Sequence, residues 1–184
     1  MKNKDTYGLL VFNALKFFIK NPYEEIYLRD FSRRLNISPN TAQRFLNLFL
    51  KENFIKEEKK ANLRFFKANL DNILFRYIKK TSSVKELIEG GLINLLKNVS
   101  SFVVLYGSVA KGLDDKNSDI DLLIISSKKK EVDEILLVLE KRFNRTINSH
   151  TFSFVEWEKQ KKDNKAFYQE IISTGINLIG EIPI

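Results

Sequence analysis

The chain has 184 residues, no cysteine, and a hydrophobic fraction of 43% that includes 15 Phe. This apolar content can fill the core of one medium domain or two small ones, and it excludes a disordered chain. The lack of cysteine excludes disulfides and thiolate metal sites. The N-terminus lacks the pattern of a signal peptide, and no stretch approaches the about 18 apolar residues of a membrane helix, so we expect a cytoplasmic protein without membrane association.

Positive charge is concentrated in the first part of the chain. Residues 1–70 hold 14 Lys and Arg against 7 Asp and Glu, whereas residues 71–184 hold 17 against 16. Such asymmetry indicates a basic module with an anionic partner. The alternative is a solvated, lysine-rich surface without a specific partner.

The N-terminal part is predicted to contain three helices. Apolar residues recur at helical spacing over residues 7–20, and a short amphipathic helix is predicted over residues 26–35. Ser38 can cap a third helix, and Pro39 suits its first turn because no amide donor is needed there. This helix is predicted to run towards Asn53.

The second and third helices, joined by a tight turn, resemble a helix-turn-helix. Residues 54–59 and 63–68 then alternate as a β-hairpin does. In this order the elements resemble a winged helix domain over residues 1–70, for which double-stranded DNA is the expected partner. The side chains expected to contact DNA from the start of the third helix are Asn40, Thr41, Gln43 and Arg44. A role in protein contacts or homodimerisation is the alternative, because a fold alone does not fix its partner.

Two helical segments are predicted next, over residues 71–80 and 84–96, with breaks at Thr81–Ser83 and at Gly90-Gly91. Asp71 is the predicted N-cap of the first segment. We therefore interpret residues 71–97 as a connector with the first helix of a second domain, and residues 98–184 as the remainder of that domain.

Residues 102–125 carry the chemistry. The apolar run Phe102–Tyr106 is typical of a strand buried on both faces. Gly107 then allows a sharp turn, and Ser108 begins a short helix that is closed by Gly112. Backbone amides and a hydroxyl at a helix start are suited to bind phosphate oxygens.

Asp119 and Asp121 open a second apolar strand. Their spacing of two places both carboxylates on one face of that strand. Adjacent carboxylates repel each other unless a cation lies between them, and hard oxygen ligands suit Mg²⁺ or Mn²⁺. A phosphate site facing such a metal site is suited to metal-assisted nucleotidyl transfer.

The G-S-x10-D-x-D pattern formed by Gly107, Ser108, Asp119 and Asp121 resembles the signature of minimal nucleotidyltransferases of the DNA polymerase β superfamily, and the similarity covers residues 85–180. The resemblance implies an α+β fold, with a small mixed sheet flanked by helices after the winged helix domain. It also implies that Gly107 and Ser108 hold a nucleoside triphosphate, while Asp119 and Asp121 bind Mg²⁺ or Mn²⁺. Lys111 and Ser118 are further expected nucleotide-binding residues.

One part of the family pattern is missing. Catalytic members bring a third carboxylate from the next strand, but the strand predicted over residues 145–154 contains no acid. Asn148 could supply a neutral oxygen ligand, or His150 could serve as a general base. The third alternative is that this function is lost and the domain only binds nucleotide.

We therefore expect a metal-dependent nucleotidyltransferase that moves an NMP unit from an NTP to a hydroxyl acceptor, with a DNA-binding N-terminal domain. One alternative is a catalytically degenerate, nucleotide-binding winged-helix regulator of transcription. The other is a member of a toxin-antitoxin pair that binds a helical partner protein.

Overall fold

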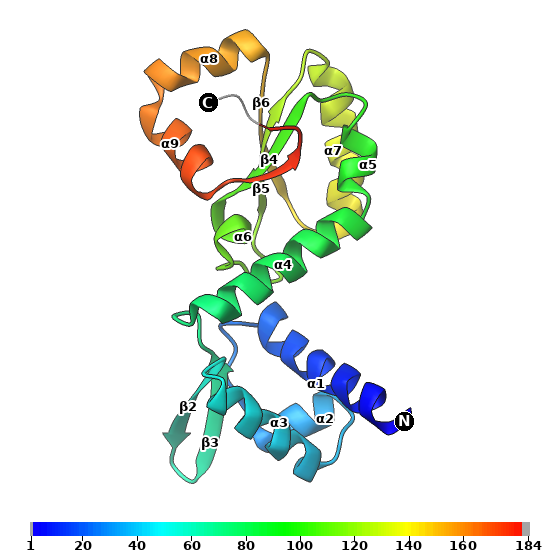
Figure 1. Cartoon of the computed structure of the whole chain (residues 1–184), viewed down its shortest axis with the longest axis vertical. Coiled ribbons are helices and arrows are strands. Elements are labelled where there is room, and N and C mark those ends of the chain that lie inside the picture. The colour runs from blue at the N-terminus through cyan, green and yellow to red at the C-terminus, as the bar shows by residue number, and fades with distance from the viewer. Residues whose placement is uncertain (1, 182–184) are drawn as a thin grey trace. The chain divides into compact units, whose positions relative to one another are not determined.

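The computed structural model describes residues 2–181, with side chains from residue 8 onward. The chain divides into two units, one up to Ile78 and one from Lys79 (Figure 1). Each unit combines helices with its own sheet, so the α+β class expected from the sequence is confirmed. Within the described residues, no helix combines the length and the apolar character needed to cross a membrane.

The first unit places three helices against a three-stranded sheet. Its elements are α1 (Lys2–Lys20), β1 (Ile26–Tyr27), α2 (Leu28–Arg34), α3 (Pro39–Lys51), β2 (Ile55–Lys60) and β3 (Leu63–Ala68). The strand order is β1-β3-β2, and both pairings are antiparallel. The predicted hairpin is confirmed, since its register runs from Ile55 opposite Ala68 to Lys60 opposite Leu63.

Helix α3 begins as the sequence predicts. The Ser38 hydroxyl accepts a hydrogen bond from the Thr41 amide at 3.1 Å, and Pro39 is the first helical residue. The inner face of the helix buries Phe45, Leu46 and Phe49.

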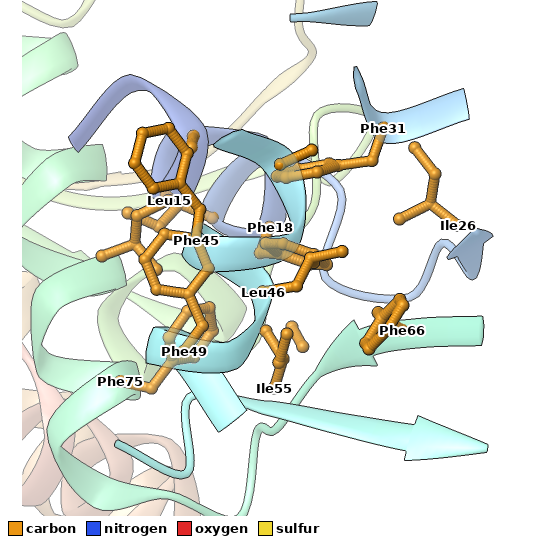
Figure 2. Packing of buried hydrophobic residues seen from close by; sticks show 14 residues of the cluster. Leu15, Phe18, Ile26, Phe31, Phe45, Leu46, Phe49, Ile55, Phe66 and Phe75 are labelled. Atoms are coloured by element: carbon orange, nitrogen blue, oxygen red, sulfur yellow. The ribbon is translucent and has the colours of Figure 1, made fainter. Parts of the chain in front are cut away.

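These side chains meet those of α1 in the core. Figure 2 shows Phe18 beside the α3 side chains, and the rings of Phe18 and Phe49 meet edge to face with centroids 6.2 Å apart. The ring of Phe31 from α2 lies 5.3 Å from that of Phe18. Because aromatic burial fixes this face inward, the polar start of α3 is left towards solvent.

The prediction of a helix over residues 26–35 is wrong at its start. Ile26 and Tyr27 form β1 and pair with Phe66 and Phe65 of β3. Ile26 is buried, and this β-branched residue packs well against the sheet, so tertiary pairing outweighs the helical pattern. The helix itself, α2, covers only Leu28–Arg34.

The predicted break at Thr81–Ser83 is also wrong. Helix α4 (Ile73–Glu89) runs through it without interruption. Serine and threonine disfavour a helix interior by only a few tenths of a kcal/mol each, which burial of Leu87 on the same helix outweighs. The break at Gly90-Gly91 is confirmed, because Gly91 has a φ of +87° before α5 (Leu92–Leu96).

Asp71 is not the cap of α4. Asn72 provides the cap, since its side-chain oxygen accepts a hydrogen bond from the Phe75 amide at 2.9 Å. Asp71 instead forms an ion pair with Lys56.

The second unit is built on a mixed sheet. Its strands are β4 (Phe102–Tyr106), β5 (Ile120–Ile125), β6 (Ile147–Phe152) and β7 (Ile176–Ile179), in the order β6-β5-β4-β7. Strands β5 and β6 are parallel and are connected through α7 (Lys129–Phe143), while the other pairings are antiparallel. The remaining helices are α6 (Gly107–Lys111), α8 (Phe154–Asp163) and α9 (Lys165–Thr174).

Helices cover both faces of this sheet (Figure 1). Alternate residues of β4 and β5 pack on one side against α5 and α7, and on the other against α8 and α9. Leu122, for example, belongs to the first cluster, whereas its neighbour Leu123 packs in the cluster around Trp157. The central strands are therefore buried on both faces, as their continuous apolar runs predict.

Candidate active site

The order of strand, turn and strand brings the predicted phosphate and metal residues to one end of the sheet. Tyr106, the last residue of β4, is paired with Asp121 near the start of β5. Gly107 follows immediately with a φ of +68°, a conformation that glycine adopts without strain. A Cβ atom added to Gly107 would lie 2.8 Å from the Asp121 Cγ, so the carboxylate packs directly on the backbone of the turn.

The two aspartates converge on a single amide. Asn148 of β6 is the register partner of Asp121. Its Nδ2 lies 3.1 Å from the Asp119 Oδ2 and 3.5 Å from the Asp121 Oδ1, as donor to both carboxylates. Both carboxylates therefore lie within reach of one amide, and Asn148 occupies the adjacent place on the neighbouring strand.

Negative charge is crowded at this point. The pKa of Asp121 is raised, mainly by burial and also by the charges of Asp119 and Glu170. The hydrogen bond from Asn148 and the charge of His150 lower this pKa, but by less. The pKa of Tyr106 is raised to about 12 by burial and by the nearby Asp121 and Glu170 carboxylates. The Tyr106 hydroxyl is therefore neutral at physiological pH, and the site favours an added cation or proton.

The donor set at this point fits a hard divalent cation. Asp119 is exposed and Asp121 half-buried, so their oxygens remain open to a ligand. Carboxylate oxygens, with an amide that can turn its carbonyl oxygen inward, match the preferences of Mg²⁺ and Mn²⁺. Over the part of the chain that the structure describes, no group of three acidic, His or Cys side chains is close enough to form a metal cluster. The third acid is thus absent from β6 and is not replaced from elsewhere in those residues.

Lys111 of α6 meets a residue that the sequence pattern did not reveal. Its Nζ lies 2.6 Å from the Glu170 Oε1 of α9, and both side chains are 38% exposed. Glu170 comes 59 residues later in the chain, so no local spacing could connect the two. The structure therefore brings two further charged groups, Lys111 and Glu170, to the edge of the site that contains Asp119 and Asp121.

Ser118 is held within its own loop. Its hydroxyl donates to the Asp115 Oδ1 and accepts from the Asp115 amide, each at 2.9 Å. Ser108, by contrast, is half-buried at the start of α6, and no described residue forms a hydrogen bond with its hydroxyl. Among the residues that the structure describes, Ser118 has hydrogen-bond partners for its hydroxyl and Ser108 has none.

His150 lies in a group of aromatic rings beside the site. Its ring is nearly parallel to that of Phe152, with centroids 6.2 Å apart, and it meets Phe167 at 5.1 Å and Tyr106 at 6.5 Å. His150 comes two residues after Asn148 on β6, so strand periodicity puts both side chains on the same face of the sheet. Asn148 therefore lies closer to the aspartates than His150 does along the strand.

The residues predicted to contact DNA lie on the first two turns of α3. Asn40 and Arg44 are exposed, and no described residue forms an ion pair with Arg44. The Gln43 amide donates to the Asn47 side chain at 2.8 Å, and the Thr41 hydroxyl lies 2.9 Å from that of Ser38. Gln43 also lines a cavity of about 590 Å³, together with residues of β1, α2 and β3 and with Asn62 of the β2–β3 turn.

The match to a known family falls on the C-terminal part of the chain. No curated protein matches the chain. Among solved structures, one chain described as "Crystal structure of the toxin-antitoxin with AMP-PNP" is 19% identical, covers 50% of this chain and 73% of that one, and has a TM-score of 0.39. The sequence model of the family described as "Polymerase beta, Nucleotidyltransferase" matches residues 91–182, which is half of the chain and includes every strand of the second sheet. The chain belongs to this nucleotidyltransferase family.

Proposed function

We propose that the second unit transfers an NMP unit from an NTP to a hydroxyl acceptor, with a divalent cation held by Asp119 and Asp121. The observation that carries this proposal is the convergence of both carboxylates on Asn148, directly beside the Gly107-Ser108 turn. A site for a cation and a site for phosphate are thus adjacent.

Each residue has a role that follows from its position. Asp119 and Asp121 supply anionic oxygens, and the packing of Asp121 on Gly107 fixes its carboxylate against the turn. The Ser108 hydroxyl and the α6 backbone receive phosphate oxygens. Lys111 exchanges its ion pair with Glu170 for the triphosphate, whose greater charge attracts it more strongly.

A bound Mg²⁺ or Mn²⁺ would neutralise charge on the transferred and leaving phosphates and lower the pKa of the acceptor hydroxyl. The side chains around this point favour a bound cation, because Asp121 is partly desolvated and lies close to the negative charge of Asp119. Asn148 holds both carboxylates in place by donating its amide protons until a cation is bound. His150, packed among aromatic rings, is the candidate general base, whereas Asn148, beside both aspartates, is the candidate neutral oxygen ligand.

The experiment that tests this proposal is transfer of label from an NTP carrying ³²P at its α-phosphate, with Mg²⁺ present and pyrophosphate measured as the co-product. Saturable binding of the nucleotide without any pyrophosphate would favour the alternative of a degenerate, nucleotide-sensing regulator.

Asn148→Asp should strengthen the site. The added carboxylate would stand beside Asp121 in the parallel register, where it can serve as the third acid. We expect tighter Mg²⁺ binding and a rate of pyrophosphate release about 10-fold or more above wild type, since a positioned general base contributes roughly 10²–10⁴-fold. Steady-state kinetics over a Mg²⁺ series measures both effects.

The control for this change is Asn177→Asp on β7, which is exposed and paired with Val104 of β4. It makes the same chemical change on another strand of the sheet and should leave both quantities unaltered. A fall in rate for Asn148→Asp would show that the neutral amide itself is required.

We further propose that the first unit is a winged helix domain that binds duplex DNA. Its element order ends with α3 and the β2–β3 hairpin, and exposed Asn40 and Arg44 lie at the start of α3. The excess of positive charge over residues 1–70 supports contact with phosphates.

Arg44→Gln should therefore weaken duplex binding by roughly 10-fold or more and reduce the slope of affinity against salt concentration. Lys51→Gln, at the exposed far end of the same helix, is the matched control and should have a smaller effect. Fluorescence anisotropy across a salt series gives both slopes. An affinity that does not change with salt would instead support the protein-contact alternative.

A further inference from the structure

The loop that connects the phosphate turn to the aspartates contains a buried ion pair. Asp114 is 3% exposed, and its Oδ1 lies 2.7 Å from the Nζ of Lys79 on α4. The Lys79 side chain is only 1% exposed. Ser83, one turn further along α4, donates to the other Asp114 oxygen at 3.4 Å. The middle of the loop is therefore attached to α4.

Arg145 connects the Asp114 carboxylate to the backbone carbonyls of Ser118 and Asp119. Its Nη1 lies 3.8 Å from the Asp114 Oδ2. Its Nε donates to the Ser118 carbonyl at 2.5 Å, and its Nη2 donates to the Asp119 carbonyl at 3.3 Å. The guanidinium thus fixes the backbone at the residue that offers the first metal-binding carboxylate.

The loop between these attachments is closed internally. Asp115 accepts hydrogen bonds from the Asn117 amide and the Ser118 hydroxyl through one oxygen. Burial raises the pKa of Asp115, but these hydrogen bonds and the charge of Lys79 lower it by more, so the net shift is downward. An ionised Asp115 keeps this turn closed at physiological pH.

Stability alone is a poor explanation for this arrangement. Removing two charges from water costs several kcal/mol per ion, and replacing a buried pair by apolar side chains is often neutral or stabilising. In some proteins, however, buried charged groups are retained because they favour one conformation over others. This loop leads directly into Asp119, whose backbone carbonyl accepts a hydrogen bond from Arg145.

We propose that Lys79, Asp114 and Arg145 are positioning residues, which hold Asp119 in the geometry that binds the divalent cation. This inference rests on the proposed metal site at Asp119 and Asp121. None of the three is proposed to touch the cation or the nucleotide. Their effect is transmitted through the backbone carbonyls of Ser118 and Asp119.

The test separates positioning from folding. The double variant Lys79→Met with Asp114→Leu removes both charges while keeping apolar volume, so its melting temperature should equal or exceed that of wild type. Its dissociation constant for Mn²⁺, measured by titration calorimetry on the full chain, should rise roughly 10- to 100-fold, as for other losses of outer support to metal ligands. Lys85→Met with Glu89→Gln removes an exposed pair from the same helix and should change neither quantity.

Arg145→Lys provides a second, independent variant that leaves the buried pair intact. Lysine keeps the charge but cannot donate to two carbonyls in a fixed fork, so we expect weaker Mn²⁺ binding with little loss of stability. Mn²⁺ affinity equal to wild type in both folded variants would overturn the inference alone. Failure of the wild-type protein to bind Mn²⁺ would overturn the proposed metal site and this inference together.

Discussion

Replacing Asp119 or Asp121 by asparagine is expected to lower the rate of nucleotidyl transfer by roughly 100-fold or more. Loss of an outer partner of a metal ligand already costs about 10- to 100-fold in affinity or activity, and here a ligand itself is lost. The two carboxylates are the only acids that meet at Asn148 among the described residues. The measurement is the rate of pyrophosphate release at saturating Mg²⁺.

Stability should move in the opposite direction for Asp121→Asn. The pKa of Asp121 is raised in the folded protein, mainly by burial and by Asp119, so the ionised carboxylate destabilises the fold. Below the unfolded pKa of about 3.9 both states are protonated and the variant gains nothing. The stability that the variant gains over wild type grows as pH rises from the unfolded pKa through the folded pKa. Above the folded pKa this gain is constant.

Melting temperatures of wild type and Asp121→Asn over a pH series test this dependence. Asp133→Asn on α7, an exposed acid outside the site, is the matched control and should affect neither activity nor the pH profile. A variant with lower stability and retained activity would mean that Asp121 serves the fold and not the chemistry.

Gly107→Ala is expected to damage both the fold and the site. A residue with a Cβ atom costs about 1–2 kcal/mol at the left-handed φ of +68°. The added Cβ would also lie 2.8 Å from the Asp121 Cγ, closer than real Cβ contacts, so the carboxylate must move away from Asn148. Activity and Mn²⁺ affinity should therefore fall together with the melting temperature.

Gly91→Ala separates these two effects. Gly91 has a φ of +87°, but its added Cβ would meet only the flexible end of Arg142, at 2.7 Å. The variant should lose stability through the backbone and keep the wild-type rate per folded molecule. If Gly107→Ala also kept that rate, the proposed packing of the turn on Asp121 would not matter for activity.

Much of the site could be predicted from the sequence, because the residues concerned lie close together in the chain and local strand geometry places their side chains. Gly107 and Asp121 belong to a strand–turn–strand segment, in which antiparallel pairing and period-2 alternation fix the relative placement of the side chains. The same holds for Ser38 and the start of α3, where capping chemistry acts over three residues. The sequence also named Asn148 and His150 as candidate substitutes for the third acid, and the parallel pairing of β5 and β6 puts Asn148 opposite Asp121.

The features that sequence reasoning missed depend on long-range contacts. Ile26-Tyr27 became a strand because Phe65 and Phe66 pair with it, some forty residues later. Glu170 reaches Lys111, and Lys79 reaches Asp114, across 59 and 35 residues. No local periodicity encodes such pairs, and a lysine within a helical pattern is ordinarily expected to lie on a solvated face.

Nucleotidyl transfer moves the α-phosphorus of the nucleotide to the acceptor and releases the β- and γ-phosphates as pyrophosphate. Wild-type protein, Mg²⁺ and an acceptor fraction of total cellular protein and RNA would be incubated in parallel with NTPs labelled with ³²P at the α- or the γ-phosphate. We predict that α-label enters the acceptor fraction with matching release of pyrophosphate, and that γ-label appears only in pyrophosphate. Asp119→Asn should lower the rate of both processes by roughly 100-fold or more. Transfer of γ-label to the acceptor, or release of inorganic phosphate with no acceptor labelled, would contradict nucleotidyl transfer at Asp119 and Asp121.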